Sequence, residues 1–338
     1  MCIRDRPRSD PVIYDSNHKG TDRYRLQIKN GMGVFEMKFS IWPHLSGTFE
    51  DLTKVCTSAE KLGWDGLWIA DHFMPNTGDD TTVSGATAEA WTTLAAIASV
   101  VPRMRVGTLV TGNTYRNPAV LAKMAAQVDI ISKGRLVLGL GAGWQINEHG
   151  AYGIDFHTVG GRLRRLEESV QIIRSLLDND RTDFSGRYYE IKDAPLEPKP
   201  IQEHLPILIG GGGEKVTLRI TAEHADEWNV WGSPSVLEAK GKILETHCES
   251  VGRDPHEITR SAQALFVVSK DKATITAARE SGGGRVLAGT PDEIVEIMGQ
   301  YEAAGVDELI IPNFNMGSTD QVLETYSLWM DDIISQVK

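Results

Sequence analysis

Residues 135–153 read RLVLGLGAGWQINEHGAYG, and this stretch decides the fold. Its first half is a short apolar run, which is typical of a strand covered on both faces in a parallel sheet. Gly139, Gly141 and Gly143 then allow the backbone to bend and to approach another group closely. The stretch therefore predicts a buried strand, Arg135 to Gly139, whose carboxyl end opens into a polar loop.

The spacing of these glycines argues against a dinucleotide-binding fold of the Rossmann type. The G-x-G-x-x-G fingerprint would require glycine at position 144, and this chain has Trp144 there. The loop instead carries polar and aromatic side chains, namely Trp144, Gln145, Asn147, Glu148, His149 and Tyr152. We expect the chemistry of the protein to begin in this loop.

The composition limits the partners of the protein. It has 338 residues with 35 basic and 46 acidic side chains, which gives a net charge of -11. Such a chain argues against nucleic acid or an anionic membrane as the main partner. No apolar run approaches the ~18 residues that a membrane span needs. Cys2, Cys56 and Cys248 are odd in number and lack metal-ligand spacing, so we expect a reduced, cytoplasmic protein without a disulfide framework or a metal site.

The first 36 residues differ from the rest of the chain. They are polar, show no periodic pattern and lack the apolar segment of ~7 to 15 residues found in a secretory signal. We interpret residues 1–36 as an incorrectly extended start, with Met32 or Met37 as the native beginning. The alternative is a genuine disordered arm. In either case residues 37–338 are expected to form one folded domain.

From Met37 onward, short β-like runs alternate with amphipathic helical patterns in eight units. The predicted strands are residues 39–43, 66–70, 105–111, 135–139, 206–210, 227–231, 260–268 and 308–312. The predicted helices are residues 48–62, 87–100, 118–132, 161–178, 214–224, 235–251, 291–304 and 319–337. Because the strands are rich in Val, Ile and Leu, they indicate a parallel sheet, and eight βα units indicate a closed (β/α)8 TIM barrel.

The longest interruption of this pattern is residues 180–202, between the fourth helix and the fifth strand. It contains Tyr188, Tyr189 and several prolines among alternating polar residues. A connection of this length in a compact domain is uncommon unless it is functional. We interpret it as an insertion and a candidate lid.

A TIM barrel places its functional site at the carboxyl ends of the strands. The residues expected there are Pro43, His44, Asp71, His72, residues 109–113, residues 141–147, residues 210–213, Trp231, Gln263, Asn313 and Asn315. Glycines, amides, histidines and tryptophans outnumber carboxylates in this set. The composition suits the binding of a flat, phosphorylated ligand better than it suits hydrolysis.

Asp71 and His72 directly follow the second predicted strand. An imidazole there can donate to a ligand carbonyl or protonate a substrate, while the neighbouring carboxylate fixes the loop. A histidine near a strand end is more often a surface or capping residue. The buried apolar run immediately before the pair favours a catalytic role.

Gly210, Gly211, Gly212 and Gly213 precede a helical pattern. Such a turn leaves free backbone N–H groups at the start of a helix, where the helix dipole also favours an anion. The spacing of a Walker loop is absent. A loose turn is the simpler interpretation, but four glycines are costly to order unless the backbone must approach a ligand. We therefore predict a phosphate-binding turn.

The end of the third strand is less informative. Leu109, Val110 and Thr111 read as a strand that runs into a turn. Arg116 either pairs with an anionic ligand or braces the loop, and the residues alone do not decide between these roles. The sequence contains neither an H-E-x-x-H metal motif nor a G-x-S-x-G nucleophile motif.

Four segments carry a family resemblance: ADHF at 70–73, VGTLVTGNTYRNPAVLAKMAAQVD at 106–129, GRLVLGLGAGWQINEHGAYG at 134–153 and ILIGGGGEK at 207–215. Together they resemble the bacterial luciferase-like monooxygenase superfamily, and within it the branch that uses the deazaflavin coenzyme F420. The resemblance covers nearly all of the chain from Met37 onward. It implies a (β/α)8 barrel, usually dimeric, that holds a flavin or deazaflavin in its mouth.

The resemblance implies roles for residues on both sides of the cofactor ring. Asp71 and His72 would lie beside the ring, with His72 donating a proton or a hydrogen bond. Leu109, Val110 and Thr111 would form a bulge that backs the ring, with a non-prolyl cis peptide between Leu109 and Val110.

The resemblance also implies contacts to the rest of the cofactor. Asn147 matches a cofactor-contacting asparagine, and Gly212 and Gly213 match glycines that hold the phosphate. The chain departs from the pattern at Trp144, where relatives that oxidise sugar phosphates have a glutamate acid. This departure argues against sugar-phosphate dehydrogenation and leaves the substrate unassigned.

We therefore expect an oxidoreductase that transfers a hydride between coenzyme F420 and an unidentified small organic substrate. The closest alternative is an FMNH2-dependent monooxygenase that acts on an alkanesulfonate or an aldehyde, because only the cofactor ring would differ. A second alternative is a barrel that binds a ligand without turnover. The expected partners are the deazaflavin or flavin, the substrate and a second copy of the chain in a homodimer.

Overall fold

The computed structural model describes residues 28–29, 32–33, 37–76, 78, 81–282 and 286–338. The chain divides into two units, Met1–Val34 and Phe35–Lys338. In the first unit, β1 (Ile28–Lys29) pairs with the antiparallel strand β2 (Met32–Gly33). Apart from these two short strands, the interpretation of residues 1–36 as disordered or extraneous falls outside the described residues.

The second unit is built on eight parallel strands that close into a barrel. They are β3 (Lys38–Trp42), β4 (Gly66–Ile69), β5 (Arg105–Thr108), β7 (Leu136–Gly141), β10 (Ile207–Gly210), β11 (Glu227–Trp231), β12 (Thr259–Gln263) and β15 (Glu308–Pro312). The pairing runs in the order β10, β11, β12, β15, β3, β4, β5, β7, and β7 also pairs with β10, which closes the ring. The predicted (β/α)8 fold is confirmed.

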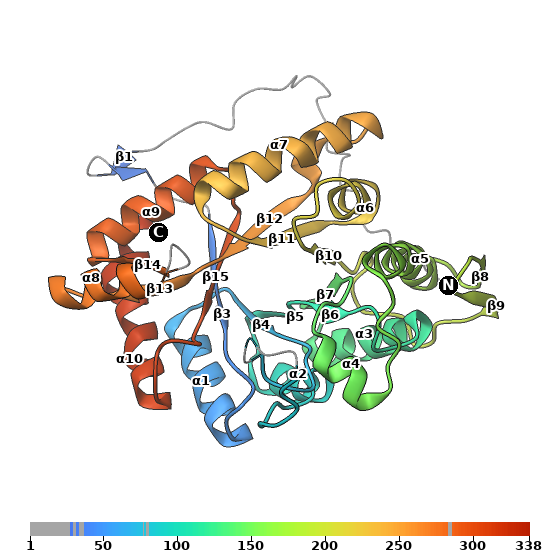
Figure 1. Ribbon diagram of the computed structural model, residues 1–338, viewed down its shortest axis with the longest axis horizontal. Coiled ribbons are helices and arrows are strands. Elements are labelled where there is room, and N and C mark those ends of the chain that lie inside the picture. The colour runs from blue at the N-terminus through green and yellow to red at the C-terminus, as the bar shows by residue number, and fades with distance from the viewer. Residues whose placement is uncertain (1–27, 30–31, 34–36, 77, 79–80, 283–285) are drawn as a thin grey trace, which may run out of the picture. The chain divides into compact units, whose positions relative to one another are not determined.

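Helices surround these strands (Figure 1). They are α1 (Phe49–Leu62), α2 (Ala90–Val100), α3 (Pro118–Ser132), α5 (Val159–Asp178), α6 (Thr217–His224), α7 (Pro234–Ser250), α9 (Pro291–Ala303) and α10 (Thr319–Leu328), which continues through a π-helix (Trp329–Ile334) into α11 (Ser335–Val337). Within the described part of the chain, no helix combines the length and the apolar character needed to cross a membrane.

Local sequence signals explain where the first helices begin and end. The Thr48 hydroxyl accepts a hydrogen bond from the Asp51 N–H at the start of α1, and Gly63 ends that helix in the left-handed conformation. The Asn117 side chain accepts from the Ala119 N–H at the start of α3, where proline occupies the first turn. These caps fix the connections that lead into and out of the strands.

The seventh unit departs from the predicted pattern. The strand predicted at 260–268 is two strands, β12 and β13 (Leu265–Val268). β13 pairs in parallel with β14 (Val286–Gly289), and α8 (Lys272–Ser281) lies between them in the sequence. The chain therefore leaves the barrel after Gln263, because β13 pairs with β14 and, among the described strands, with no strand of the closed ring. This break leaves Gln263 at the carboxyl end of a barrel strand.

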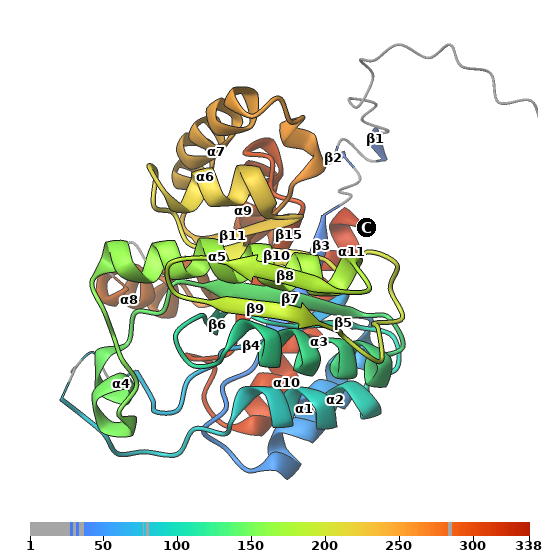
Figure 2. The same ribbon diagram turned by 90° about the vertical axis from the view of Figure 1, so that its right-hand side faces the viewer.

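The predicted insertion is present as an antiparallel hairpin of β8 (Thr182–Ser185) and β9 (Glu190–Ala194), which lies beside α5 (Figure 2). The Glu168 carboxylate of α5 accepts the Tyr188 N–H at 2.9 Å. After the hairpin, the Gln202 side chain donates to the carbonyl oxygen of Leu136, the first residue of β7. The end of the insertion therefore lies at the amino-terminal ends of the strands, and the interpretation of the insertion as a lid stays a prediction.

Candidate active site

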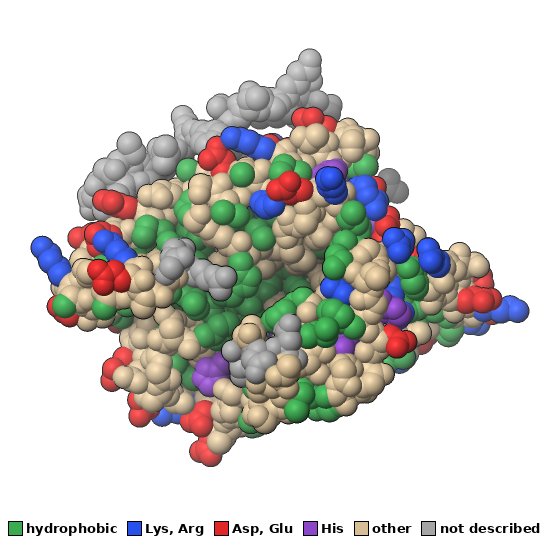
Figure 3. Space-filling view, viewed as in Figure 1, with side chains coloured by type: hydrophobic (Ala, Val, Ile, Leu, Met, Phe, Trp, Pro, Cys, Tyr) green, Lys and Arg blue, Asp and Glu red, His purple; other side chains and the backbone are tan. Residues whose placement is uncertain are grey.

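A cavity of about 970 Å³ opens at the carboxyl ends of the strands. The residues that line it follow all eight barrel strands, as expected for a TIM barrel. Figure 3 shows green hydrophobic side chains gathered in the hollow of this face. The volume is at the upper end of the range for small-molecule and cofactor sites, roughly 300–1,000 Å³.

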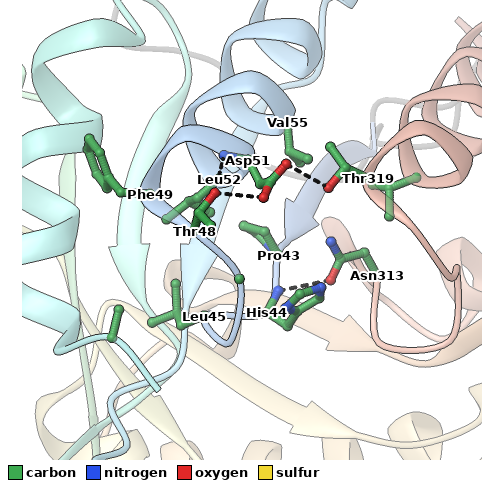
Figure 4. Close-up of a pocket in the computed structure, with 13 residues that line it drawn as sticks. Pro43, His44, Leu45, Thr48, Phe49, Asp51, Leu52, Val55, Asn313 and Thr319 are labelled. Atoms are coloured by element: carbon green, nitrogen blue, oxygen red, sulfur yellow. Dashed lines mark hydrogen bonds between the residues drawn. The ribbon is translucent and has the colours of Figure 1, made fainter. Parts of the chain in front are cut away.

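A second cavity beside the first is much smaller, about 80 Å³, and lies between the start of α1 and the end of β15. Figure 4 shows the contact that shapes it: the His44 N–H donates to the Asn313 side-chain oxygen at 2.8 Å. This space holds at most a few waters, since a water takes about 30 Å³ in the liquid. The larger cavity is therefore the candidate active site.

A β-bulge forms the wall of the large cavity at the end of β5. Gly107 pairs with Val137, and Thr111 of β6 (Thr111–Gly112) pairs with Leu140. Three residues lie between the paired positions on this strand and only two on β7, so the strand carries one extra residue. The Leu109–Val110 peptide in the bulge is cis, as the family resemblance implied.

The Val110 side chain occupies a niche that consists of glycines. A Cβ atom on Gly141 would lie 2.6 Å from Val110 Cγ2, and one on Gly210 would lie 2.8 Å from Val110 Cγ1. A Cβ atom on Gly139 would collide with the backbone carbonyl of Thr108. The alternating glycines of β7 are therefore required by the bulge, which is the close approach that their spacing predicted.

Thr111 lies behind the bulge and does not line the cavity. Its hydroxyl accepts a hydrogen bond from the Trp91 indole N–H at 3.0 Å and donates to the Thr108 hydroxyl at 3.1 Å. These contacts anchor the bulge to α2. Leu109 and Val110 line the cavity itself. The cofactor contact predicted for Thr111 stays a prediction.

The glycine turn after β10 lies on the next part of the wall, and all four of its glycines line the cavity. Gly211 has a left-handed φ of 125°, which favours glycine there. A Cβ atom on Gly213 would lie 2.7 Å from the Thr217 hydroxyl at the start of α6. Within the described chain, no hydrogen bond occupies the N–H groups of Gly212 and Gly213. The turn can therefore offer these groups to an anion.

Asp71 lines the cavity but is held by a bidentate ion pair. Arg116 Nη1 donates to Asp71 Oδ2 at 2.6 Å, and Nη2 donates to Oδ1 at 3.2 Å. Burial raises the pKa of the Asp71 carboxyl, and the Arg116 guanidinium opposes this effect. Arg116 also donates to Glu89, the N-cap of α2, at 2.6 Å. Arg116 therefore braces the loop, which was one of its two predicted roles.

His72 lines the cavity and is oriented by a buried carboxylate, Glu148. His72 Nδ1 lies 2.9 Å from Glu148 Oε1. The Phe73 N–H donates to the other oxygen at 2.7 Å, and the Tyr115 hydroxyl donates to Oε1. Burial acts to raise the pKa of Glu148, but the hydrogen bonds from His72, Tyr115 and Phe73 outweigh it and lower the pKa.

The ionised Glu148 carboxylate fixes which nitrogen of His72 carries its proton. A carboxylate only accepts hydrogen bonds, so Nδ1 holds the hydrogen and Nε2 has the lone pair when the ring is neutral. Among the described residues, no hydrogen bond engages Nε2. The Trp144 ring packs edge-on against the imidazole, with centroids 5.3 Å apart. His72 is thus positioned to exchange a proton with a molecule in the cavity.

Glu148 lies on α4 (Ile146–Tyr152), a helix that the sequence did not predict. Seven residues are too few for a helical period to appear in the pattern. Asn147 on the same helix donates to the Thr82 carbonyl at 2.5 Å and does not line the cavity. Its predicted cofactor contact stays a prediction. The sequence pointed to the loop that contains Glu148 but gave Glu148 no role, and it did not indicate Tyr115, because the contact of each with His72 or with the other joins segments far apart in the sequence.

Glu167, Glu223 and His224 are close enough together to hold a metal ion. They lie away from the cavity, and Arg219 donates to Glu167 at 2.9 Å and to Glu223 at 2.6 Å. A cation already pairs with both carboxylates, so this group is an ion-pair cluster.

Comparison with known proteins gives a family match and several relatives. The sequence profile of the family described as luciferase-like monooxygenase matches residues 32–281. The F420-dependent glucose-6-phosphate dehydrogenase of Amycolatopsis mediterranei (strain U-32) is 36% identical over 167 residues, which are 49% of this chain and 49% of that protein. The chain thus spans about half the length of this relative.

A longer match is the F420-dependent hydroxymycolic acid dehydrogenase of Mycobacterium tuberculosis (strain ATCC 25618 / H37Rv). It is 30% identical over 283 residues, which are 79% of this chain and 74% of that protein. Among solved structures, an F420-dependent secondary alcohol dehydrogenase in complex with an F420-acetone adduct has a TM-score of 0.78 and 19% sequence identity. The superposition covers 90% of this chain and 100% of that chain, which shows a common fold.

Proposed function

Since the chain belongs to the luciferase-like monooxygenase family, we propose that it is an oxidoreductase that uses coenzyme F420, a deazaflavin, and a small organic substrate. One observation carries the proposal. His72, the bulge at Leu109 and Val110, and the glycine turn all line one cavity, and no described residue engages His72 Nε2 or the N–H groups of Gly212 and Gly213. The names of the two curated relatives described above support the choice of F420.

The residues of the cavity fit such a cofactor. Gly212 and Gly213 would hold a phosphate through their N–H groups at the start of α6, where the helix dipole favours an anion. Leu109 and Val110 would form the wall behind the ring. When bound, the deazaflavin supplies the chemistry of hydride transfer, and the protein supplies position and polarity.

The protein itself would move the proton. His72 Nε2 accepts a proton from a substrate hydroxyl, or in the reverse direction returns one to a carbonyl oxygen. Glu148 keeps the imidazole in the tautomer that leaves Nε2 free, and stabilises the ring when it becomes charged. Asp71 has a positioning role: its ion pair with Arg116 holds the loop that carries His72.

Sugar-phosphate oxidation is not part of the proposal, although a relative is a glucose-6-phosphate dehydrogenase. The family resemblance places a glutamate acid at position 144 in enzymes with that activity, and this chain has Trp144. We extend the proposal to a cytoplasmic homodimer whose folded domain is residues 37–338. The few cysteines without disulfide spacing support a reducing compartment.

The test is a cofactor titration of the purified full chain. Oxidised F420 and FMN are added separately at matched concentrations, and the quenching of tryptophan fluorescence is followed. We expect F420 to bind at least about tenfold more tightly, a difference of about 1.4 kcal/mol. Preference for FMN would instead support the monooxygenase alternative, and binding of neither would support a barrel without turnover. Light scattering on the same sample measures the molar mass and so tests whether the chain forms a homodimer.

Two glycine variants locate the cofactor. Gly210→Ala places a methyl group against Val110 and should lower F420 affinity at least about tenfold by displacing the bulge. Gly150→Ala on α4 is the matched control, because a Cβ atom there meets nothing within 4 Å. If both variants bind F420 as the wild type does, the cofactor does not lie against the bulge.

A further inference from the structure

The half of the cavity opposite the bulge has a different chemistry. In the closed barrel β12 lies across from β5, with β11 and β15 on either side of it and β3 next to β15. The ends of these four strands supply Trp231, Gln263, Phe314 and Trp42 to the cavity lining. A flat molecule against the bulge would therefore face these four side chains.

Three of these side chains form one aromatic wall, which consists of Trp42, Trp231 and Phe314. The Trp42 ring lies 5.6 Å from Trp231 and 5.0 Å from Phe314, between centroids. Trp231 is 45% exposed and Phe314 is 47% exposed, although both line the cavity. Large aromatic surface that protein atoms leave uncovered in a cavity is available to a bound apolar molecule.

The cavity offers little to a charged substrate. Among the described residues that line it there is no lysine or arginine, and the one carboxylate is Asp71. Asp71 is already neutralised by its bidentate pair with Arg116. The free N–H groups of the glycine turn are the groups that suit an anion, and the proposed cofactor would occupy them. A second phosphate or carboxylate would therefore be buried without a partner, which is costly.

One uncharged polar group remains on this side. The Gln263 side chain is 3% exposed and lines the cavity, and its carbonyl oxygen has no hydrogen-bond partner among the described residues. The amide of Asn229 is equally buried, but it donates to the Ser261 hydroxyl at 2.9 Å. Burial alone therefore does not explain why the Gln263 oxygen has no partner. Buried amides are normally hydrogen-bonded. Rotation of a free amide can present either a donor or an acceptor to a ligand.

We propose, on the basis of the function proposed above, that the substrate is an uncharged and mainly apolar organic molecule with a hydroxyl or carbonyl group. Its apolar part packs on the aromatic wall, and its oxygen exchanges a hydrogen bond with the Gln263 amide. Gln263 and Phe314 are then specificity residues. They bind the substrate and do not take part in moving the proton.

The experiment uses cyclohexanol and glucose 6-phosphate as probes of the full chain. Saturation-transfer NMR measures the affinity of each probe, once without cofactor and once with F420. We expect cyclohexanol to bind at least about tenfold more tightly than glucose 6-phosphate in at least one condition. Equal binding of the two, tighter binding of the sugar phosphate, or no binding of cyclohexanol in either condition overturns the proposal.

Variants with matched controls test the two contacts. Phe314→Ala should weaken cyclohexanol binding about fivefold or more, and Gln263→Leu should weaken it about two- to tenfold. The controls are Phe49→Ala, which removes an aromatic ring that is 54% exposed outside this cavity, and Gln300→Leu on the outer face of α9. Both controls should bind within about twofold of the wild type, since neither residue lines the cavity. Equal losses in variants and controls overturn the assignment of the wall.

This result and the cofactor titration can fail separately. If F420 does not bind but cyclohexanol binds and depends on Phe314 and Gln263, the proposed cofactor is wrong and the apolar subsite stands. If F420 binds and cyclohexanol does not, the subsite is wrong and the oxidoreductase stands. The preference of the wild type for cyclohexanol over glucose 6-phosphate tests the proposed subsite even if a variant fails to fold.

Discussion

Two buried carboxylate clusters lie at opposite ends of the same barrel. At the mouth, Glu148 on α4 orients His72. At the base, Glu308 and Glu227 share one cation, Arg105, with distances of 3.1 Å from Nη1 to Glu308 and 2.6 Å from Nη2 to Glu227. All three carboxylates belong to buried residues, yet their surroundings differ.

The difference lies in the number of donors that each carboxylate receives. Glu148 accepts from an imidazole, a tyrosine hydroxyl and the backbone N–H groups of Phe73 and Met74, and its pKa is lowered. Glu227 has one oxygen paired with Arg105, while its other oxygen has no partner among the described residues. Burial raises the pKa of Glu227, Arg105 opposes this, and the nearby charge of Glu308 adds to the rise.

Burial alone therefore does not decide the charge of a carboxyl group. Donors stabilise the ionised form at the mouth, where an ionised Glu148 is needed to orient His72. At the base, two carboxylates compete for one guanidinium, and the one with fewer donors is the easier to protonate. Glu308 is the better satisfied of the two, since the Trp68 indole and the Ser40 hydroxyl both donate to it.

The largest expected effect is on the base cluster. Glu308→Ala removes the carboxylate that pairs with Arg105 and leaves the Trp68 N–H and the Ser40 hydroxyl buried without a partner. Breaking a buried pair of this kind typically costs about 3–5 kcal/mol. We expect the free energy of unfolding, measured by urea denaturation, to fall by about that amount.

A surface variant serves as the control for this measurement. Glu249→Ala on α7 removes an exposed carboxylate and should change the free energy of unfolding by no more than about 0.5 kcal/mol. If the free energy of unfolding of Glu308→Ala fell by less than about 1 kcal/mol, the base cluster would not stabilise the fold as a buried ion pair.

The mouth cluster is expected to matter less for stability. Glu148→Ala leaves the Phe73 N–H, the Tyr115 hydroxyl and His72 Nδ1 without their acceptor, at a cost of about 1–3 kcal/mol. The side chain of His72 is 22% exposed, so water from the cavity can replace part of the lost bonding. Urea denaturation at pH 7 should therefore give a smaller loss than for Glu308→Ala.

A larger loss of unfolding free energy for Glu148→Ala than for Glu308→Ala would contradict this expectation. His72→Ala provides a second check at the mouth, because Glu148 then keeps the Phe73 and Tyr115 donors. Its cost should be smaller than that of Glu148→Ala, since removal of one donor leaves the others in place. A larger cost would show that His72 supports the fold more than the carboxylate does.

Much of the barrel could be predicted from the sequence. β11 and β15 begin and end at the predicted residues, because alternating turns and apolar runs mark both ends. α3 was also predicted with its bounds, from Asn117 before it and the helical pattern that follows. The lining glycines and His72 were predicted from their place after a buried strand, which is where a TIM barrel gathers its site.

The rest depended on contacts between distant segments. Glu148 reaches His72 across 76 positions of sequence, and no local pattern records that pairing. The role of Arg116 required the position of Asp71, 45 residues away. The insertion at 180–202 looked functional because of its length, but length does not tell which end of the barrel a connection covers.

The smallest expected effect is that the stability contributed by the two clusters depends on pH in opposite directions. The pKa of Glu227 is raised from its usual 4.5, so its contribution to stability is complete below that value and is lost as the pH rises through the folded pKa. The pKa of Glu148 is lowered from 4.5, so its contribution is present above that value and is lost as the pH falls through the folded pKa.

Two glutamine variants measure these opposite slopes by urea denaturation. Relative to the wild type, Glu227→Gln should become more stable as the pH rises from 5 to 8, because the wild-type contribution is lost as the pH passes the raised pKa of Glu227. The deficit of Glu148→Gln should stay constant over that range and shrink as the pH falls below about 4.5, where the carboxyl group takes up a proton first in the unfolded chain and only at lower pH in the folded protein. The stability of each variant relative to the wild type is plotted against pH. Equal slopes for the two variants would mean that the number of donors does not set the charge of the carboxylate at either end of the barrel.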